Sequence, residues 1–407
     1  MLKKTYRFNK SEILFFSAWI LFLLSLLIGA TTLQGIKYLV VLAKGLRYLA
    51  YLICCAEICR TKIKKNKTFI LIFIFLIFII SCISSTNKTL LLYLLVLFAS
   101  INIDKRKIMR LTTRIQGFFL AIVVLLSRIG IMEDHLFGRN SDRIRHGLGF
   151  SWTTTGPILY FYFMLGYIYL RKEKFGVGEA ILLEIINILF YQLTDTRMAF
   201  MLSTLFLIFF SVQNLNRRRW RKLSKLKGFY LLIPTALCIL AFVSAIYFNQ
   251  NQHTFAAVNK LLSNRLMLGH QAIKQYGFTL FGQPIKWMGY SIKHPMLADS
   301  QYNYVDSSYL QLALNYGMLL IAVVVAMYTY GIYKAIRQQD YYLVFIYLFV
   351  LVFALTEPRL MNFAFNPFPL MIFSGKPIKK WKRVPNFRQE ESGQQGNQPL
   401  LDGEMNA

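Results

Sequence analysis

The charged residues of this chain that could act on a phosphate or a sugar fall in a few short segments. Guanidinium groups bind phosphate oxygens through paired hydrogen bonds, and a carboxylate can orient or deprotonate a hydroxyl. These residue types therefore suit transfer chemistry on an anionic substrate. The segments are GRNSDRIRHGLGFSWTTTGP (138–157) with Arg143, Arg145 and His146, LTDTRMAF (193–200) with Asp195 and Arg197, LLSNRLMLGHQAI (261–273) with Arg265, YNYVDSSYLQLALNYG (302–317) with Asp306 and Tyr309, and TEPRLMN (356–362) with Glu357 and Arg359.

Each cluster also has a simpler interpretation. The arginines of 138–157 suit a solvated loop, and Asp195 with Arg197 suits a structural ion pair at a tight turn. Arg265 suits a surface position on a helix. Asp306 stands just before an apolar helix and suits an N-cap, where its oxygen would accept backbone N–H bonds.

The composition of the chain predicts an all-α membrane protein. Of its 407 residues, 56% are hydrophobic and only 16% are charged, a balance outside that of soluble domains. Several apolar runs approach the roughly 20 residues that a helix needs to cross a bilayer. The run at 11–30 is expected to remain as a helix, because no small-residue cleavage site follows it.

About twelve membrane spans are expected. Most of the 47 Lys and Arg residues lie in short segments between the apolar runs. Such loops stay on the cytoplasmic side, so both termini are expected to be cytoplasmic and the net charge of +29 does not indicate a nucleic-acid partner. The expected spans are 11–30, 36–59, 68–86, 89–103, 111–131, 157–170, 178–193, 198–213, 228–248, 307–333, 341–356 and 366–374.

The spans divide the chain into four parts. An N-terminal membrane bundle (1–248) is followed by a large extracytoplasmic loop (249–306), C-terminal membrane helices (307–375) and a polar, disordered cytoplasmic tail (376–407). A loop of that length is usually functional or disordered. Its apolar content favours folding, and AVNKLLSNRLMLGHQAIKQYG predicts one amphipathic helix across the outer membrane face, with Gly277 as its C-cap.

This topology places all the charged clusters on the same outer face. Charge at the edge of a membrane is costly and indicates a functional site. The outer loops show no pair of aspartates suited to a divalent cation, so neither a metal nor a cofactor is expected. The five cysteines fall in apolar runs and are expected to pack as small residues.

The chain resembles the Wzy-type polysaccharide polymerases, in the superfamily that includes the O-antigen ligases. The resemblance lies in RHGLGFSWTTTGP before a helix, TDTR between two helices, NRLMLGHQAIKQYGFTLFGQPIKWMG in the large loop, and YVDSSYLQLALNYG leading into the next helix. Two departures are visible. The ligase branch commonly carries a His near the loop-to-helix junction, where this chain has Asp306, and the first loop lacks the Pro-Asn often seen there.

The resemblance implies a GT-C-like, metal-independent glycosyltransferase in the bacterial plasma membrane. It would transfer a growing glycan from polyprenyl pyrophosphate to a hydroxyl of a new lipid-linked repeat unit on the outer face. The implied partners are lipid-linked oligosaccharide as donor and acceptor, membrane lipid, a chain-length regulator and a flippase.

The residue chemistry agrees with that reaction. Arg197, Arg265 and Arg145 are the candidates to stabilise the leaving pyrophosphate. Asp306 would orient or deprotonate the acceptor hydroxyl. The remaining candidates for substrate contacts are Arg143, His146, Asp195, Tyr309, Glu357 and Arg359.

Other functions remain as alternatives. A flippase for lipid-linked oligosaccharide would share the substrate, but flippases of that kind tend to have two similar halves and short outer loops. A ligase would differ only in its acceptor. An ion-coupled transporter would be expected to show broken helices paired across repeats, which the sequence does not show.

Overall fold

The computed structural model describes residues 9–61, 65–139, 141–215, 226–289 and 302–374. Within these ranges the chain is mostly helical, which confirms the all-α, membrane-embedded architecture. Seven described helices are long and apolar enough to cross a membrane. Shorter apolar helices accompany them, and the count of twelve spans remains a prediction. The predicted tail at 376–407 lies outside the described residues.

The N-terminal part consists of five helices. They are α1 (Lys10–Gly29), α2 (Lys37–Arg60), α3 (Lys65–Ser84), α4 (Thr89–Ala99) and α5 (Lys105–Arg128). Polar side chains define where two of them begin. Asn9 and Glu12 form a capping box at the start of α1, and the Asp104 carboxylate accepts hydrogen bonds from the backbone N–H groups of Arg106 and Lys107 at the start of α5. Such caps satisfy N–H groups that the helix itself leaves unpaired.

The loop after α5 contains a β-hairpin, which the sequence did not predict. Strand β1 (Leu136–Arg139) pairs antiparallel with β2 (Ser141–His146). The chain then enters α6 (Thr155–Arg171), α7 (Val177–Thr194) and α8 (Arg197–Leu215). Between α7 and α8, Asp195 adopts a left-handed conformation with φ 47° and ends α7, which makes the short turn that the TDTR segment predicted.

The large loop after α10 (Lys227–Ile246) folds into two helices. The prediction of one continuous amphipathic helix was wrong, because α11 (His253–Leu261) and α12 (Arg265–Tyr276) are separate. Ser263 and Asn264 between them have φ values of 55° and 66°, a conformation that an α-helix does not accommodate. Gly277 ends α12 with φ 66°, as predicted.

The predicted span at 307–333 is interrupted. It consists of α13 (Ser308–Tyr316) and α14 (Met318–Arg337), separated by Gly317 with φ 95°. The segment after α12 lies directly on this junction. The Met318 N–H donates to the Thr279 carbonyl, and the Leu319 N–H donates to the Leu280 carbonyl. A side chain at Gly317 would collide with the backbone of Leu280 and Phe281, so only glycine fits there.

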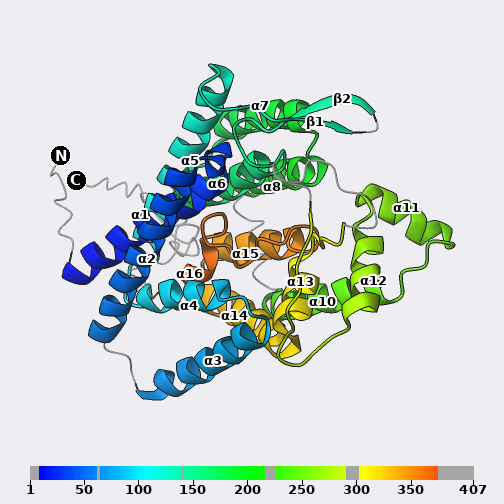
Figure 1. The fold of residues 1–407 in the computed structure, drawn as a ribbon. Helices are drawn as coiled ribbons and strands as arrows, with labels where there is room; N and C mark the ends of the chain where they lie inside the picture. Colours follow the sequence, from blue (N-terminus) through cyan, green and yellow to red (C-terminus); the bar gives the residue numbers. More distant parts are fainter. Residues whose placement is uncertain (1–8, 62–64, 140, 216–225, 290–301, 375–407) are drawn as a thin grey trace, which may run out of the picture.

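The helices are arranged with distinct ends. Figure 1 shows the hairpin and α11–α12 at one end of the bundle, opposite the first turn of α1. Helix α15 (Tyr341–Phe353) runs through the middle of the bundle toward the α11–α12 end. The predicted span at 366–374 is instead a short helix, α16 (Phe368–Phe373), which is too short to cross a membrane.

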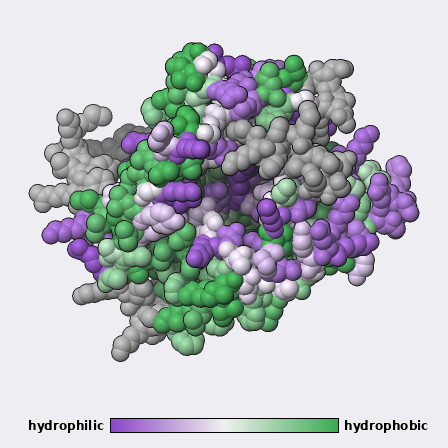
Figure 2. Space-filling model, viewed as in Figure 1, coloured by the Kyte–Doolittle hydropathy of each residue, from purple (hydrophilic) through white to green (hydrophobic). Residues whose placement is uncertain are grey.

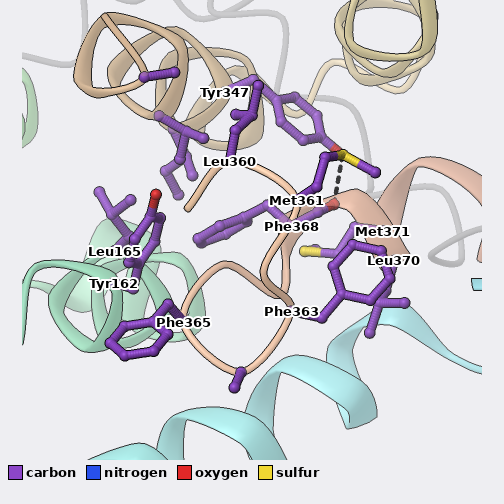
Figure 3. Close-up of a cluster of buried hydrophobic side chains, with 14 of the residues drawn as sticks. Tyr162, Leu165, Tyr347, Leu360, Met361, Phe363, Phe365, Phe368, Leu370 and Met371 are labelled. Atoms are coloured by element: carbon purple, nitrogen blue, oxygen red, sulfur yellow. Dashed lines mark hydrogen bonds between the residues drawn. The ribbon is translucent and has the colours of Figure 1, made fainter. Parts of the chain in front are cut away.

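Between α15 and α16, residues 354–367 form a non-helical segment inside the bundle. Figure 3 shows the hydrophobic side chains of this segment and of α16 packed against Tyr162 and Leu165 of α6 and against Tyr347 of α15. Irregular backbone at membrane depth is tolerated only where protein groups satisfy its hydrogen bonds. Here Gln116 of α5 donates from Nε2 to the carbonyls of Ala364 and Phe365, at 2.8 and 2.9 Å.

Other buried side chains complete this arrangement. The amide of Asn366 donates to the Leu360 carbonyl at 2.6 Å and to the Tyr328 hydroxyl at 2.9 Å. The ammonium of Lys334 donates to the carbonyls of Ile372 and Ser374. The segment is therefore held by side-chain hydrogen bonds in place of the regular ladder of a helix.

The role of Gln116 can be measured. Gln116→Leu is expected to lower the free energy of unfolding by about 2–4 kcal/mol, because two buried carbonyls lose their donor. Thermal unfolding in detergent, followed by helical circular dichroism, measures the change. The control is Gln192→Leu at an exposed position of α7, which is expected to leave the melting temperature nearly unchanged. Equal melting temperatures for the two variants would contradict this account of the buried segment.

Candidate functional site

A cavity of about 530 Å³ lies at the α11–α12 end of the bundle. Its walls come from parts of the chain that are far apart in sequence: the start of α6, the start of α8, the start of α12, the segment before α13, and the residues after α15. Figure 2 shows hydrophilic residues gathered in the middle of the viewed face and over the α11–α12 end, between apolar flanks. The charged residues in the cavity wall are Arg265, Lys286, Asp306, Glu357 and Arg359.

Arg265 and Asp306 meet in this cavity. The Arg265 Nη2 atom lies 3.2 Å from the Asp306 Oδ2 atom, and 19% and 28% of the two side chains are exposed. Arg265 is placed by the first turn of α12, where its Nη1 also donates to the Leu262 carbonyl. Its Nε is buried and has no hydrogen-bond partner within the described residues. A buried, unpaired donor beside a cavity is costly unless a ligand accepts from it.

Asp306 does not cap the helix that follows it. The N-cap of α13 is Ser307, whose side chain makes no capping hydrogen bond. Asp306 stands one residue earlier, and its carboxylate forms an ion pair with Arg265 of α12. The capping interpretation of Asp306 therefore fails, and the carboxylate is placed to interact with contents of the cavity.

Glu357 and Arg359 form a second ion pair in the same wall. The Glu357 Oε1 atom accepts a hydrogen bond from Arg359 Nη1 at 2.6 Å. The Arg359 guanidinium also lies over the Phe365 ring, 4.9 Å from its centroid, which adds a cation–π contact. This pair is therefore fixed by the buried segment described above.

A buried hydroxyl links the two ion pairs. Ser308, two residues after Asp306, donates from Oγ to the Glu357 carbonyl at 2.5 Å and accepts from the Leu360 N–H at 3.1 Å. The Ser308 N–H donates to the Ala354 carbonyl. The start of α13 and the segment after α15 are thus joined next to the cavity, which fixes the distance between the Asp306 and Glu357 carboxylates.

Burial shifts the pKa values of both carboxyl groups in the same direction. Burial raises the pKa of the Asp306 carboxyl above its ordinary value, and the guanidinium groups of Arg265 and Arg359 oppose that rise. Burial also raises the pKa of the Glu357 carboxyl, with Arg359 acting in the opposite direction. A carboxylate with a raised pKa is a better base than an exposed one. Asp306 is the more accessible of the two, because 28% of its side chain is exposed against 7% for Glu357.

Aromatic side chains also line the cavity, and none of them was singled out from the sequence as a candidate. They are Trp152, Trp287, Tyr302 and Tyr304. Trp287 and Tyr304 meet edge to face with ring centroids 6.4 Å apart, and the Trp287 Nε1 donor has no partner within the described residues. Aromatic faces beside unpaired donors suit a sugar ring. The aromatic residues of SWTTTGP, IKWMG and YNYVD are visible in the sequence, but the orientation of their rings depends on the fold.

Asp195 and Arg197, two of the candidates from the sequence, lie outside the cavity wall. Thr196 and Met198 line the cavity, whereas the side chain of Arg197 between them is 56% exposed and its Nε lies 3.6 Å from Asp195 Oδ1. Asp195 itself is buried at the end of α7. The structure thus separates Arg197 from the pair formed by Arg265 and Asp306.

Arg145, His146 and Tyr309 have structural partners. Arg145 donates from Nε to the Thr194 carbonyl at 2.8 Å, which ties β2 to the end of α7. His146 contacts Asp134 through Nδ1 at 2.7 Å. Tyr309 is fully buried and donates to the Leu351 carbonyl at 3.0 Å, which leaves its hydroxyl directed into the bundle. Arg143 belongs to β2.

The described residues contain no group of three or more His, Cys, Asp and Glu side chains that could hold a metal ion. Guanidinium and carboxylate groups beside aromatic rings can bind an anionic glycoside and move a proton. Comparisons with protein-family models, with curated proteins and with solved structures found no match for this chain.

The pKa of Asp306 can be measured directly. Its titration midpoint is expected to lie above the value of about 3.9 for an exposed aspartate, and Arg265→Gln is expected to raise it further, because burial remains while an opposing positive charge is lost. Infrared difference spectra between the protein and Asp306→Asn, recorded across pH, isolate this carboxyl band. Arg128→Gln, at an exposed position of α5, is the control. A downward shift in Arg265→Gln would refute the assigned ion pair.

Proposed function

We propose that the chain is a glycosyltransferase that joins polyprenyl-pyrophosphate-linked oligosaccharide repeat units into a cell-surface polysaccharide on the outer face of the bacterial plasma membrane. The observation that carries the proposal is the convergence of Arg265 and Asp306 in one cavity at one end of a membrane-embedded bundle. The resemblance of the sequence to Wzy-type polymerases names the substrate class. The α11–α12 end is then the outer end.

The cavity supplies the groups that the donor half-reaction needs. The bond between the anomeric carbon of the donor glycan and the pyrophosphate oxygen breaks, and negative charge develops on the leaving pyrophosphate. Fixed guanidinium groups stabilise such charge without a metal ion. Arg265 is the first candidate, because its Nε is buried and unpaired beside the cavity. Arg359 and Lys286 add positive charge to the same wall.

Asp306 serves the acceptor. The hydroxyl at the non-reducing end of a lipid-linked repeat unit attacks the anomeric carbon, and its proton passes to the Asp306 carboxylate. Burial raises the pKa of this carboxyl, which makes the carboxylate a better proton acceptor than an exposed aspartate. Trp287 and Tyr304 line the same cavity and are placed to hold sugar rings.

Transfer at one face accounts for the site better than translocation does. Arg265, Asp306, Glu357 and Arg359 converge in one cavity at the α11–α12 end. A flippase needs cations along a path across the membrane, so that a charged head group stays compensated throughout. A ligase would use the same donor chemistry, and only the acceptor distinguishes it from a polymerase.

Deletion of the gene separates these functions. Cells without the protein are expected to accumulate single lipid-linked repeat units on the outer face of the plasma membrane. These lipids can be extracted and supplied to proteoliposomes that contain the purified chain, where a ladder of polymer lengths is the expected product. Accumulation on the inner face would indicate a flippase, and transfer to a different acceptor without polymer would indicate a ligase.

Substitutions in the cavity test the assigned roles. In the proteoliposome assay, Arg265→Ala is expected to reduce the transfer rate about 10²–10³-fold, as measured when one donor to a developing oxyanion is removed. Asp306→Asn, which preserves shape but removes the base, is expected to reduce it about 10²–10⁴-fold. Arg128→Ala, at an exposed position of α5, serves as the matched control.

All three variants are expected to insert into the membrane and to show helical circular dichroism. Polymer of normal length and rate from Arg265→Ala would remove the leaving-group assignment. A full transfer rate from Asp306→Asn would remove the assignment of the base.

A further inference from the structure

A second hollow lies on the side of the bundle, between α8 and α15. It has a volume of about 480 Å³ and nearly all of its lining is apolar. Leu205, Ile208 and Val352 in its wall are also exposed on the surface of the bundle, so the hollow is a groove open to the surrounding lipid. The lining residues are Leu202, Leu205, Ile208, Phe209, Val212, Gln213, Leu348, Phe349 and Val352.

The groove begins where the charged cavity ends. On α8, Met198 and Ala199 line the cavity, and Leu202, one turn further along, lines the groove. On α15, Phe353 lines the cavity and Val352 lines the groove. From Leu202 to Val212 the groove follows α8 for about 15 Å, at a rise of about 1.5 Å per residue. That length is about half the thickness of the hydrocarbon core.

We propose that this groove binds the polyisoprenoid tail of the lipid-linked substrate, while the pyrophosphate and the first sugars occupy the cavity. This inference rests on the proposed function. Its basis is the continuity of an apolar groove with a cationic cavity on the same two helices, which matches the two parts of one amphiphile. An apolar chain in the groove leaves the anionic group that it carries next to Arg265 and Arg359.

Arg197 fits this arrangement at the outer end of the groove. It lies on α8 eight residues before Leu205 and eleven before Ile208, which places the three residues on one face of the helix. Its side chain is 56% exposed. A guanidinium above an apolar groove at the membrane surface is placed to contact a lipid phosphate that is entering the cavity. This position gives a role to a residue that does not line the cavity itself.

Photocrosslinking tests the occupant without requiring transfer activity. A benzophenone amino acid replaces Leu205 or Val352 in the groove, in the full chain held in nanodiscs of phosphatidylethanolamine and phosphatidylglycerol. The control position is Leu49 on α2, which is the same residue type and similarly exposed, at 47% against 54% for Leu205. Helix α2 packs against α1 and α4. The probe is radiolabelled undecaprenyl diphosphate.

The expected result is about tenfold more labelled adduct at Leu205 and Val352 than at Leu49, corresponding to a modest preference over bulk lipid. Excess unlabelled undecaprenyl diphosphate is expected to abolish the difference, and the same excess of phosphatidylglycerol is not. Two groove positions guard against one poorly folded variant. Equal labelling at all three positions, or equal competition by phosphatidylglycerol, would show that the groove holds bulk lipid and would overturn the inference.

The outcome is separable from the test of function. Selective labelling of the groove in a protein that makes no polymer would refute the polymerase and keep the polyprenyl site. Polymer synthesis by a protein whose groove is not selectively labelled would keep the polymerase and place the lipid tail elsewhere.

Discussion

Non-helical backbone inside an apolar bundle must find its hydrogen-bond partners among side chains, and this constraint shapes the end of the bundle that holds the cavity. The segment from 354 to 367 leaves α15 and turns back through the core. Gln116, Asn366 and Ser308 satisfy its carbonyl and N–H groups. In a helix at the same place, the backbone N–H and C=O groups would have bonded to one another. The irregular path instead presents Glu357 and Arg359 to the cavity, and the buried ring of Phe365 packs against Arg359.

The balance of charge in the cavity follows from the same constraint. Two carboxylates and two guanidinium groups lie in its wall, and burial penalises each of them unless it is paired. The two carboxylates differ in exposure, since 7% of the Glu357 side chain is exposed against 28% of the Asp306 side chain, whereas the two arginine side chains are exposed to a similar degree. One pair therefore maintains the shape of the wall, and the other remains accessible. The proposed chemistry uses the accessible pair.

Much of this arrangement could be predicted from the sequence, and the failures have local causes. Apolar runs of membrane length placed most of the helices to within a few residues. A long apolar segment in a membrane has to pair its own backbone N–H and C=O groups, and a helix does this. The β-hairpin at 136–146 was missed since its polar strands lack a clear alternation. Gly317 was read as part of a continuous apolar run, and only its backbone contact with Leu280 reveals the break.

At the site, the residues were easier to select than their geometry. Arg265 and Asp306 were both selected, but their pairing depends on how α12 and α13 meet. Arg197 was also selected, and a single position along α8 decides that Thr196 and Met198 line the cavity while Arg197 is exposed on the outside. Which face of a helix turns toward its neighbours depends on packing, and the presence of a charged residue in the sequence does not indicate it.

The contact between the segment after α12 and the α13–α14 junction has a mechanical consequence. Thr279 and Leu280 accept the first N–H groups of α14, and the Gln283 N–H donates to the Asn315 carbonyl of α13. The same strand of chain continues to Lys286 and Trp287 in the cavity wall. Moving that part of the wall would break the hydrogen bonds that the first N–H groups of α14 donate to Thr279 and Leu280. The part of the cavity wall that carries Lys286 and Trp287 is accordingly a rigid extension of the bundle.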